Sequence, residues 1–384
     1  MAREIKAAVM TAPGKMEVQR LPWPDLERGA VLLQMEMSGI CGTDKHAYRG
    51  EATLYAGTEA EQQIVYPTVH GHENVGTIVE MLPDDERRIE YHREPLRVGD
   101  RVTMCPNVIC QECWYCRHIL AYPFCANNTT IGLSYPSTEH PYVVGGFAEY
   151  MYVPPKAWVY KIPEEMPTRL AVLTELFVVA GTLDRAKEFS RLEARGFNFG
   201  DTVLIQGVGA VGMMFVIRAR LLGAGNIIAV DASPWKLQMA REFGADYTID
   251  TSSTTQAERI AYVKDLTEGR GADVVVECVG IPDVLPEGLE MLRRGGTYIE
   301  TGNFVETGTV VIDVHRHIAA KNVLLIGNTN HAHTLYESAM KMMMKTKDSI
   351  PWDRFITGVH KVDDAAAAMK ASFRPESLKE VIVP

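Results

Sequence analysis

Five of the seven cysteines of this chain lie between residues 105 and 125, in CPNVICQECWYCRHILAYPFC. Cys110, Cys113 and Cys116 follow a C-x2-C-x2-C spacing, and Cys125 comes after eight intervening residues. Four thiolates this close in sequence can complete a tetrahedron around Zn²⁺. A site closed by four protein sulfurs keeps no open position, so we expect this metal to hold the lobe together and to do no chemistry.

A disulfide-bonded or free-thiol loop and an iron–sulfur site are the alternatives for this lobe. The N-terminal residues show no apolar core followed by small residues, so no secretory signal is predicted and the cytoplasm is the expected location. Thiols stay reduced there, which favours zinc over disulfides. Cys105 and Cys278 fall outside the spacing and are expected to be small buried side chains.

A second group of side chains that could bind a metal or move a proton lies in three separate segments. Cysteine, histidine and carboxylate ligands suit a Zn²⁺ site that folding assembles. Spacing alone cannot connect them, because a lone cysteine is usually a core residue and a lone glutamate is usually solvated. The segments are GICGTDKH, VHGHENVG and LTELF, with Cys41, Thr43, Asp44, His46, His70, His72, Glu73 and Glu175.

A glycine motif predicts a dinucleotide site. Gly207, Gly209 and Gly212 form G-x-G-x-x-G directly after the apolar run DTVLIQ and at the start of a helical pattern. Asp231 ends the next predicted strand and would repel a 2′-phosphate, which favours NAD(H) over NADP(H). Lys236, one helical turn beyond, is expected to help hold the ribose. The alternative is an ordinary glycine turn followed by an aspartate that caps a helix.

Two kinds of element must position these residues. The first 180 residues read as short β-like runs punctuated by glycine and proline, which predicts a mainly β, barrel-like domain. From about residue 200, strands alternate with helices, which predicts a doubly wound parallel sheet and therefore an α/β fold. We expect a catalytic domain over 1–179, a Rossmann domain over 180–328, and a return to the catalytic domain over 329–384.

Composition excludes some classes of partner. The 384 residues carry a net charge of −10, which argues against a nucleic-acid surface. No apolar run approaches the length of a transmembrane helix, so no membrane partner is expected. A small-molecule substrate remains the expectation.

The motifs together resemble a known family. GICGTDKH, GHENVGTIVE, VGDRV, the four-cysteine lobe, GGFAEY and GDTVLIQGVGAVG occur in this order, over nearly the whole chain. They are similar to the zinc-dependent medium-chain alcohol/polyol dehydrogenases, in the sorbitol and threonine dehydrogenase branch. The resemblance implies a GroES-like catalytic domain beside the Rossmann domain, a catalytic and a structural zinc in each subunit, NAD(H), an alcohol substrate, and a homodimer or homotetramer.

The resemblance also assigns a ligand set. It implies that Cys41 and His72 are the first two ligands of the catalytic zinc. Glu175 stands where many members carry the third ligand, and Glu73 matches a glutamate beside the metal that can also approach it.

Further roles are implied for a proton path and for the cofactor. Thr43 matches the hydroxyl that takes the proton of the substrate, Asp44 the acid that orients the histidine ligand, and His46 the histidine that passes the proton to water. The residues implied to hold the dinucleotide, with the last four at the carboxamide, are Gly207, Gly209, Val211, Gly212, Asp231, Lys236, Gly302, Asn303, Gly327 and Asn328.

The chain also departs from the family pattern. Glu175 is followed by Leu176 and Phe177, where the sorbitol-like branch usually has Pro-Leu, and residues 51–66 and 181–197 look like extended segments. We expect these differences to affect the substrate pocket and the oligomer contacts, and to leave the chemistry unchanged.

The expected reaction is reversible, zinc-dependent oxidation of a secondary alcohol, polyol or sugar-like alcohol by hydride transfer to NAD⁺. The alternatives are a zinc-free enoyl or quinone reductase of the same fold and a non-catalytic NAD-binding protein. Four further histidines resemble metal ligands but lack a partnered acid or cysteine pattern, so no metal role is expected for His315, His317, His331 and His333.

Overall fold

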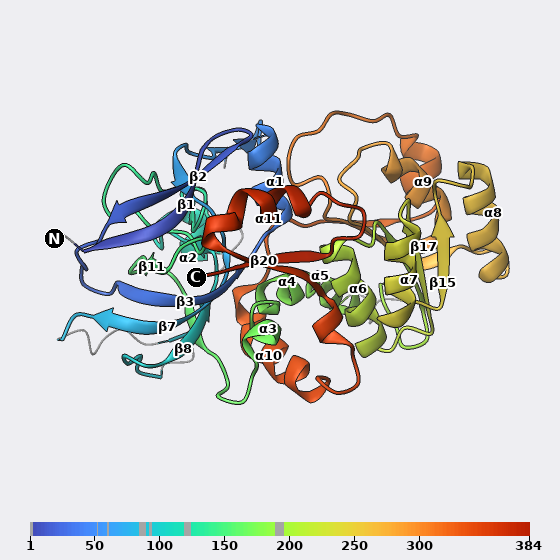
Figure 1. Ribbon diagram of the computed structural model, residues 1–384. Coiled ribbons are helices and arrows are strands. Elements are labelled where there is room, and N and C mark those ends of the chain that lie inside the picture. The colour runs from blue at the N-terminus through green and yellow to red at the C-terminus, as the bar shows by residue number, and fades with distance from the viewer. Residues whose placement is uncertain are drawn as a thin grey trace. The chain divides into compact units, whose positions relative to one another are not determined.

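The chain folds into two compact units (Figure 1). The computed structural model describes residues 3–51, 53–59, 61–83, 90–91, 94–118, 124–188 and 196–384. The first unit contains Met1–Glu175 and His333–Pro384, and the second contains Leu176–Ala332. The domain boundaries at 179/180 and 328/329 stay predictions. Among the described helices, none is long and apolar enough to cross a bilayer.

The first unit is built around a seven-stranded sheet that joins both ends of the chain. Its order is β12-β8-β7-β3-β20-β19, with β11 also paired to β3. Because β20 lies antiparallel beside β3, the last strand of the chain is central to a sheet made mostly of N-terminal segments. The strands are β3 (Val31–Gly39), β7 (Glu73–Met81), β8 (Arg101–Met104), β11 (Tyr150–Val153), β12 (Val159–Lys161), β19 (Ile356–Lys361) and β20 (Lys379–Val383).

A smaller sheet and two short ribbons complete the β structure of this unit. β1 (Glu4–Ala12) lies between β2 (Lys15–Pro22) and β6 (Thr68–Val69). The ribbons pair β9 (Asn107–Val108) with β10 (Thr129–Thr130), and β4 (Thr53–Leu54) with β5 (Gln62–Gln63). The prediction of a mainly β unit is confirmed.

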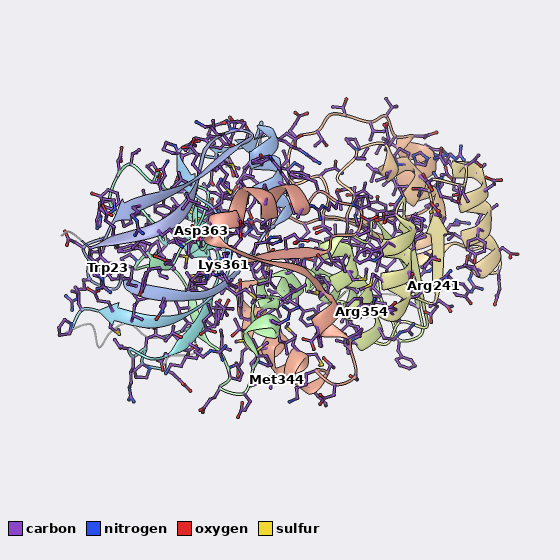
Figure 2. All side chains as sticks on the ribbon, viewed as in Figure 1. Trp23, Arg241, Met344, Arg354, Lys361 and Asp363 are labelled. Atoms are coloured by element: carbon purple, nitrogen blue, oxygen red, sulfur yellow. The ribbon has the colours of Figure 1, made fainter. Side chains whose placement is uncertain are left out.

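Short helices and contacts between surface side chains complete the first unit. Arg3 lies 3.2 Å above the ring of Trp23, and Lys6 forms an ion pair with Asp363 at 2.8 Å; Figure 2 labels Trp23 and Asp363. The helical segments are α1 (Gly42–Arg49), α2 (Trp114–His118), α3 (Thr168–Ala171), η3 (His333–Leu335), α10 (Tyr336–Lys345), η4 (Trp352–Arg354), η5 (Val362–Asp364) and α11 (Ala365–Ala371), and α4 (Thr174–Val179) runs across the boundary into the second unit.

The second unit is a six-stranded parallel sheet in the order β15-β14-β13-β16-β17-β18. Numbered within the unit, this is the 3-2-1-4-5-6 order of the Rossmann fold. The predicted α/β class and Rossmann sheet are thus confirmed. The strands are β13 (Thr202–Gln206), β14 (Asn226–Asp231), β15 (Tyr247–Asp250), β16 (Ala272–Glu277), β17 (Leu292–Glu300) and β18 (Leu324–Gly327).

Helices cover this sheet, which explains why its strands are apolar at successive positions. Leu204 packs in one cluster with Val263 of α8 and Leu289 of α9, while the flanking Val203 and Ile205 are also fully buried. Strands buried on both faces read as continuous apolar runs. The helices labelled in Figure 1 are α5 (Thr182–Glu188), α6 (Ala210–Leu221), α7 (Pro234–Glu242), α8 (Gln256–Leu266) and α9 (Val284–Met291). A further helical segment of this unit is η2 (Val314–Ala319).

Local signals set where these helices begin. Ser233 caps α7 by accepting a hydrogen bond from the Lys236 backbone N–H, and Pro234 occupies the first turn. Thr255 and Glu258 form a reciprocal capping box at the start of α8.

Candidate functional site

The first predicted ligand, Cys41, stands at the N-cap of α1. Its backbone N–H donates to Asp44 Oδ2 at 2.9 Å, so the carboxylate in the first helical turn closes the cap. The Thr43 hydroxyl lies 3.8 Å from Cys41 Sγ. The short segment thus presents a thiol and a hydroxyl side by side at the start of one helix.

Asp44 also connects this helix to both histidines of the VHGHE segment. The carboxylate is fully buried, and its Oδ1 lies 2.9 Å from His70 Nδ1 and 3.7 Å from His72 Nδ1. Asp44 was expected to orient His72, and its shorter contact is to His70. Sequence reasoning treated His70 only as a rival ligand and missed that it would share this acid.

Gly71, between the two histidines, stands where no other residue fits. Its φ of 97° lies in the left-handed region that favours glycine. A Cβ at this position would lie 2.6 Å from both the Phe147 ring and Ser38 Oγ. The glycine between the histidines is therefore required by conformation and by space.

Glu73 forms a buried ion pair that the sequence analysis did not anticipate. Its Oε1 lies 2.6 Å from Lys379 Nζ, which also donates to the Ile40 carbonyl at 3.0 Å. Both side chains are almost fully buried. Gly39 faces Glu73 across the β3–β7 pair, and a Cβ there would collide with Glu73 Oε2. The sequence around Lys379, SLKEV, gives no sign that this lysine is buried.

Glu175, the third predicted ligand, lies in the first turn of α4 and is buried. Burial and the charge of Glu73 raise the pKa of Glu175 to about 7. Burial acts against the charged form of His72, but the charges of Cys41 and Asp44 raise the pKa of His72 well above 6.5. These mutual effects show that residues far apart in sequence share one electrostatic environment.

The buried set carries an excess of groups that can be negative. Cys41, which is partly buried, and the buried Asp44, Glu73 and Glu175 share this environment with the cation of Lys379. For Lys379, burial opposes the charge, while Glu73 and Cys41 raise the pKa above its usual 10.5. A divalent cation would relieve the mutual repulsion of these acids.

The sulfur, nitrogen and oxygen ligand atoms of Cys41, His72 and Glu175 are of the types that bind zinc. They would have to lie closer together to hold one ion. His72 Nδ1 and Glu73 Oε2 are buried and have no hydrogen-bond partner among the described residues. Ligand atoms of a tetrahedral Zn²⁺ lie about 3.5 Å apart. The ligand atoms of Cys41, His72 and Glu175 do not all lie within 4.8 Å of one another. Their side chains must therefore move slightly to hold an ion together.

His46 lies on α1, beyond the ligand set. Its Nδ1 pairs with Glu51 Oε2, and the histidine side chain is 22% exposed. A histidine at this border between protein and solvent could exchange a proton with water. Most of the 51–66 segment is described, but residues 52 and 60 lie outside the described residues, as do residues 189–195 of the 181–197 extension.

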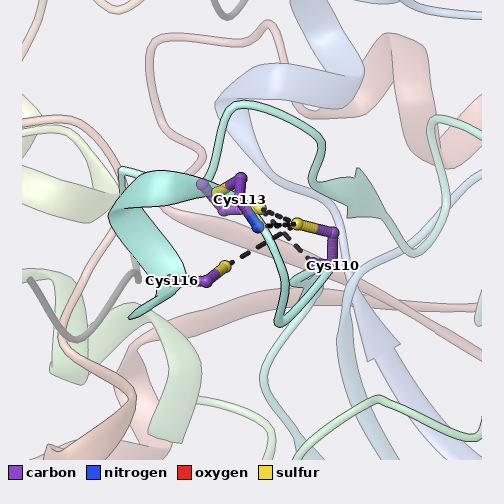
Figure 3. Close-up of side chains that lie close together, drawn as sticks. Cys110, Cys113 and Cys116 are labelled. Atoms are coloured by element: carbon purple, nitrogen blue, oxygen red, sulfur yellow. Dashed lines mark hydrogen bonds between the residues drawn. The ribbon is translucent and has the colours of Figure 1, made fainter. Parts of the chain in front are cut away.

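The four-cysteine lobe has the geometry of a metal site. The thiol sulfurs of Cys110, Cys113, Cys116 and Cys125 all lie within 4.8 Å of one another, and no disulfide joins them. Figure 3 shows three of these side chains directed toward one another near the start of α2. Backbone N–H groups donate to the sulfurs, from Cys110 to Cys125 and from Cys113 to Cys110, each at 3.3 Å.

Electrostatics at this lobe favour a thiolate at Cys110, while burial raises the pKa of the Cys116 thiol to about 12 and also raises that of the Cys125 thiol. Burial acts to raise the pKa of the Cys110 thiol, but hydrogen bonds from the backbone N–H groups of Glu112 and Cys113 lower it to about 6. A thiolate at neutral pH is the form that binds a metal. Cys105, outside the spacing, is fully buried as expected, while Cys278 is only partly buried.

In the second unit, the glycine motif takes the predicted strand-to-helix position. Gly207 has φ of 82°, Gly209 is the N-cap of α6, and a Cβ at Gly209 would meet no atom within 4 Å. A Cβ on Gly212 would collide with the Gly207 carbonyl oxygen. The motif thus combines a tight turn, an open approach to the helix N-terminus, where Val211 follows, and close helix–strand packing.

Asp231 is the last residue of β14, and its side chain connects the loop after β13 to the loop after β14. Its carboxylate accepts hydrogen bonds from the Val208 and Ser233 backbone N–H groups, each at 2.9 Å. It is partly exposed, and so is Lys236 on α7. The carboxylate is therefore held beside the glycine turn, where it could meet a ribose.

The residues predicted at the carboxamide end lie after β17 and β18. The Gly302 N–H donates to Glu277 Oε2 at 3.0 Å, and the Asn303 N–H donates to Glu300 Oε1 at 3.1 Å. Asn328, next to Gly327, donates its N–H to the Glu300 carbonyl at 2.8 Å. Two acids that sequence reasoning missed, Glu277 and Glu300, thus order this end of the sheet.

One of the four additional histidines shows an ordinary structural role. His317 Nε2 lies 3.0 Å from Glu290 Oε1, which also pairs with Arg316 at 2.7 Å. His315 is exposed. Among the described residues, none of His315, His317, His331 and His333 belongs to a group of ligand atoms that could hold a metal.

Two family models match the chain. Residues 27–164 match the alcohol dehydrogenase GroES-like domain, and residues 210–345 match the zinc-binding dehydrogenase model. The first matched range lies in the unit that contains Cys41, His72, Glu175 and the cysteine lobe. Most of the second lies in the unit with the Rossmann sheet.

Curated relatives and solved structures agree with these models. The chain is 30% identical to a 5-exo-hydroxycamphor dehydrogenase of Pseudomonas putida over 98% of both chains. It is 32% identical to an erythritol/L-threitol dehydrogenase of Mycolicibacterium smegmatis over 80% of this chain and 78% of the relative. An alcohol dehydrogenase structure from Thermotoga maritima matches with a TM-score of 0.86, 26% identity and full coverage of both chains. The chain therefore belongs to the zinc-dependent medium-chain alcohol/polyol dehydrogenase family.

Proposed function

We propose that this dehydrogenase oxidises a secondary alcohol or polyol with NAD⁺ at a zinc held by Cys41, His72 and Glu175. The observation that carries the proposal is the buried set in which these three residues influence one another's charge beside Asp44. A second zinc held by Cys110, Cys113, Cys116 and Cys125 would stabilise the cysteine lobe.

Each side chain near the metal has a distinct task. When bound, Zn²⁺ acts as a Lewis acid that lowers the pKa of an alcohol hydroxyl. The Thr43 hydroxyl, 3.8 Å from Cys41 Sγ, is placed to accept the proton of the alcohol. His46, partly exposed and paired with Glu51, passes a proton to solvent.

The surrounding residues hold this arrangement. Asp44 fixes the start of α1 through the Cys41 N–H and lies against both histidines. Lys379 balances Glu73, so this carboxylate remains buried beside the ligands without adding net charge. We propose that Glu73 stays a neighbour of the metal while paired to Lys379.

The cofactor half of the proposal concerns the second unit. NAD⁺ supplies the hydride acceptor when bound. The α6 N-terminus at Gly209 can receive the pyrophosphate, and Asp231 can accept hydrogen bonds from the adenosine ribose. A carboxylate there disfavours a 2′-phosphate, which supports NAD(H) over NADP(H). The loops at Gly302–Asn303 and Gly327–Asn328 are proposed to face the carboxamide.

The substrate class can be tested directly. NAD⁺ and NADP⁺ reduction would be measured over polyols, cyclic secondary alcohols, amino alcohols and primary alcohols. We expect turnover with secondary alcohols or polyols, NAD⁺ preferred, and loss of turnover in His72→Ala. His315→Ala, which changes an exposed histidine, is the control. Turnover by a zinc-free His72→Ala enzyme, or reduction of alkenes in place of alcohol oxidation, would contradict the proposal.

We further propose a cytoplasmic homo-oligomer, a dimer or a tetramer. The family resemblance supports the oligomer, and reduced cysteines in the lobe suit a reducing compartment. Light scattering coupled to gel filtration would give the subunit number.

A further inference from the structure

Two glutamates at the carboxyl ends of neighbouring strands form an acid pair. Glu277 ends β16 and Glu300 ends β17, and the parallel register places them directly opposite each other. Glu277 is fully buried, and the charge of Glu300 raises its pKa, which is consistent with two carboxyl groups that lie close together. Two carboxyl groups can hydrogen-bond only if one of them carries a proton, because ionised carboxylates are acceptors only.

The hydrogen-bond inventory of Glu277 fits an ionised carboxylate. Its Oε1 accepts from the Val279 and Gly280 backbone N–H groups, and its Oε2 accepts from the Gly302 N–H. A Cβ on Gly302 would collide with Oε2, so this loop can approach the acid only because it has glycine there. Both oxygens of Glu277 therefore act as acceptors.

Glu300 has one oxygen that these donors do not reach. Its Oε1 accepts from the Asn303 N–H at 3.1 Å and from Asn303 Nδ2 at 3.0 Å. Its Oε2 is buried and has no partner among the described donors. An O–H at Oε2, donated to Glu277, would satisfy this atom and explain the contact between the two acids.

Among the described residues, no positively charged side chain neutralises the acid pair in place of a proton. In the described part of the chain, no lysine, arginine or histidine forms an ion pair with either carboxyl group. The titratable neighbours are Cys278 and Tyr298, whose pKa values burial raises well above their usual range. On the covering helices, Glu287 of α9 is already paired with Arg259 of α8 at 2.6 Å. From β13, the neutral Gln206 stands in register with Glu277.

We propose that Glu277 and Glu300 share one proton, and that this proton holds the Gly302–Asn303 loop in place for the dinucleotide. The pair acts as a positioning device, because it reaches the cofactor through the loop. Loss of the proton would leave two buried charges side by side, which repel each other and release Asn303. The part about the dinucleotide rests on the proposed function.

The pair also predicts a pH range. Burial and the charge of Glu300 raise the pKa of Glu277 to about 8, and the proton belongs to the pair as a whole. A folded-state pKa above the unfolded value means that the stabilising effect is full at low pH and is lost as pH rises through about 8. Dinucleotide binding should therefore weaken above pH 8.

Glu300→Gln is the decisive variant, because its amide N–H replaces the shared proton with a donor that does not titrate. We expect the NADH dissociation constant of the wild type to rise by up to about tenfold per pH unit above pH 8. Glu300→Gln should bind NADH at pH 7 like the wild type and lose this rise. Glu306→Gln, an exposed glutamate in the same unit, removes the same charge and should follow the wild-type curve.

Infrared difference spectroscopy on the cofactor-free protein tests the proton separately. The wild type at pH 7 should show a carboxylic acid C=O band that disappears in Glu300→Gln and at pH 10. If the wild type fails to bind NADH while this band is present, the cofactor assignment is wrong and the shared proton stands. If the band is absent, or Glu300→Gln follows the wild-type pH curve, the shared proton is overturned.

Discussion

At the scale of single residues, Asp44 has more partners than its predicted role required. It closes the cap of α1 through Cys41 and lies against His70 and His72. Such a carboxylate sets the orientation and basicity of a histidine ligand. The fully buried position excludes water, so each of these contacts depends on the protein alone.

Replacing Asp44 with Asn should weaken zinc binding. The amide keeps the shape but removes the negative charge that favours His72 as a ligand. We expect a loss of about 10- to 100-fold in zinc affinity, measured by chelator competition. Glu51→Gln is the matched control, since Glu51 pairs with the partly exposed His46. Wild-type zinc affinity in Asp44→Asn would contradict this role.

Removing one partner of the Glu73–Lys379 pair should be strongly destabilising. Lys379→Met leaves a buried carboxylate without its cation, which costs about 3–5 kcal/mol of unfolding free energy. The double variant with Glu73→Gln should recover part of the loss, because the two residues are in contact. Denaturant unfolding of the four proteins measures the coupling. Additive effects would show that the ion pair is unimportant.

Glu175 predicts a pH dependence in the metal-free protein. Its folded-state pKa of about 7 lies above the unfolded value of 4.5, so the carboxyl group favours folding most below pH 4.5 and loses that effect as pH rises through 7. The metal-free wild type should therefore lose stability relative to Glu175→Gln between pH 5 and 8. Thermal unfolding at several pH values tests this, and parallel curves for the two proteins would refute it.

At the scale of elements, the short helix α2 depends on its surroundings for a defined conformation. α2 has five residues, none of them buried, and the helix carries Cys116 with Cys113 just before it. A helix this short has little stability of its own. We therefore expect the cysteine lobe to depend on a bound metal for a defined structure.

Cys113→Ser should remove the structural zinc and leave the catalytic one. The serine hydroxyl is a poor zinc ligand, so the metal content should fall from two to one per subunit. Elemental analysis gives the metal content, and limited proteolysis should show faster cleavage within residues 105–125. Unchanged zinc content would mean that the lobe binds no metal.

At the scale of the whole molecule, the two proposed sites draw on different units. The ligand set lies in the unit of Met1–Glu175 and His333–Pro384, while the glycine motif and Asp231 lie in Leu176–Ala332. This division separates metal chemistry from cofactor binding. The C-terminal segment belongs to the first unit, where β20 pairs with β3.

Removal of zinc by a chelator should abolish alcohol oxidation and leave NADH binding within about twofold. The physical reason is that no residue of the glycine turn is a metal ligand. Fluorescence titration of NADH before and after chelation measures this, with zinc added back as the control. Parallel loss of NADH affinity would show that the two sites are coupled.

Sequence patterns were sufficient where the signal is local. The C-x2-C-x2-C spacing and the glycine motif after a strand each depend on neighbouring residues, and the structure brings the four sulfurs together and places the glycines at a strand-to-helix turn. The Rossmann sheet was likewise predictable, since buried parallel strands leave continuous apolar runs. The contact of His70 with Asp44 and the roles of Lys379, Glu277 and Glu300 were missed because the partners of these residues lie on other elements.

By itself, the sequence determined the fold class, the cysteine lobe and the dinucleotide turn, because these follow from spacing and periodicity. Only the tertiary structure decided that Asp44 lies against two histidines, that Lys379 pairs with Glu73 across 306 positions of the chain, and that two strand ends bring Glu277 against Glu300. Burial is the physical reason. A carboxylate behaves in an ordinary way in water, and its charge and partners become specific only where folding removes the solvent.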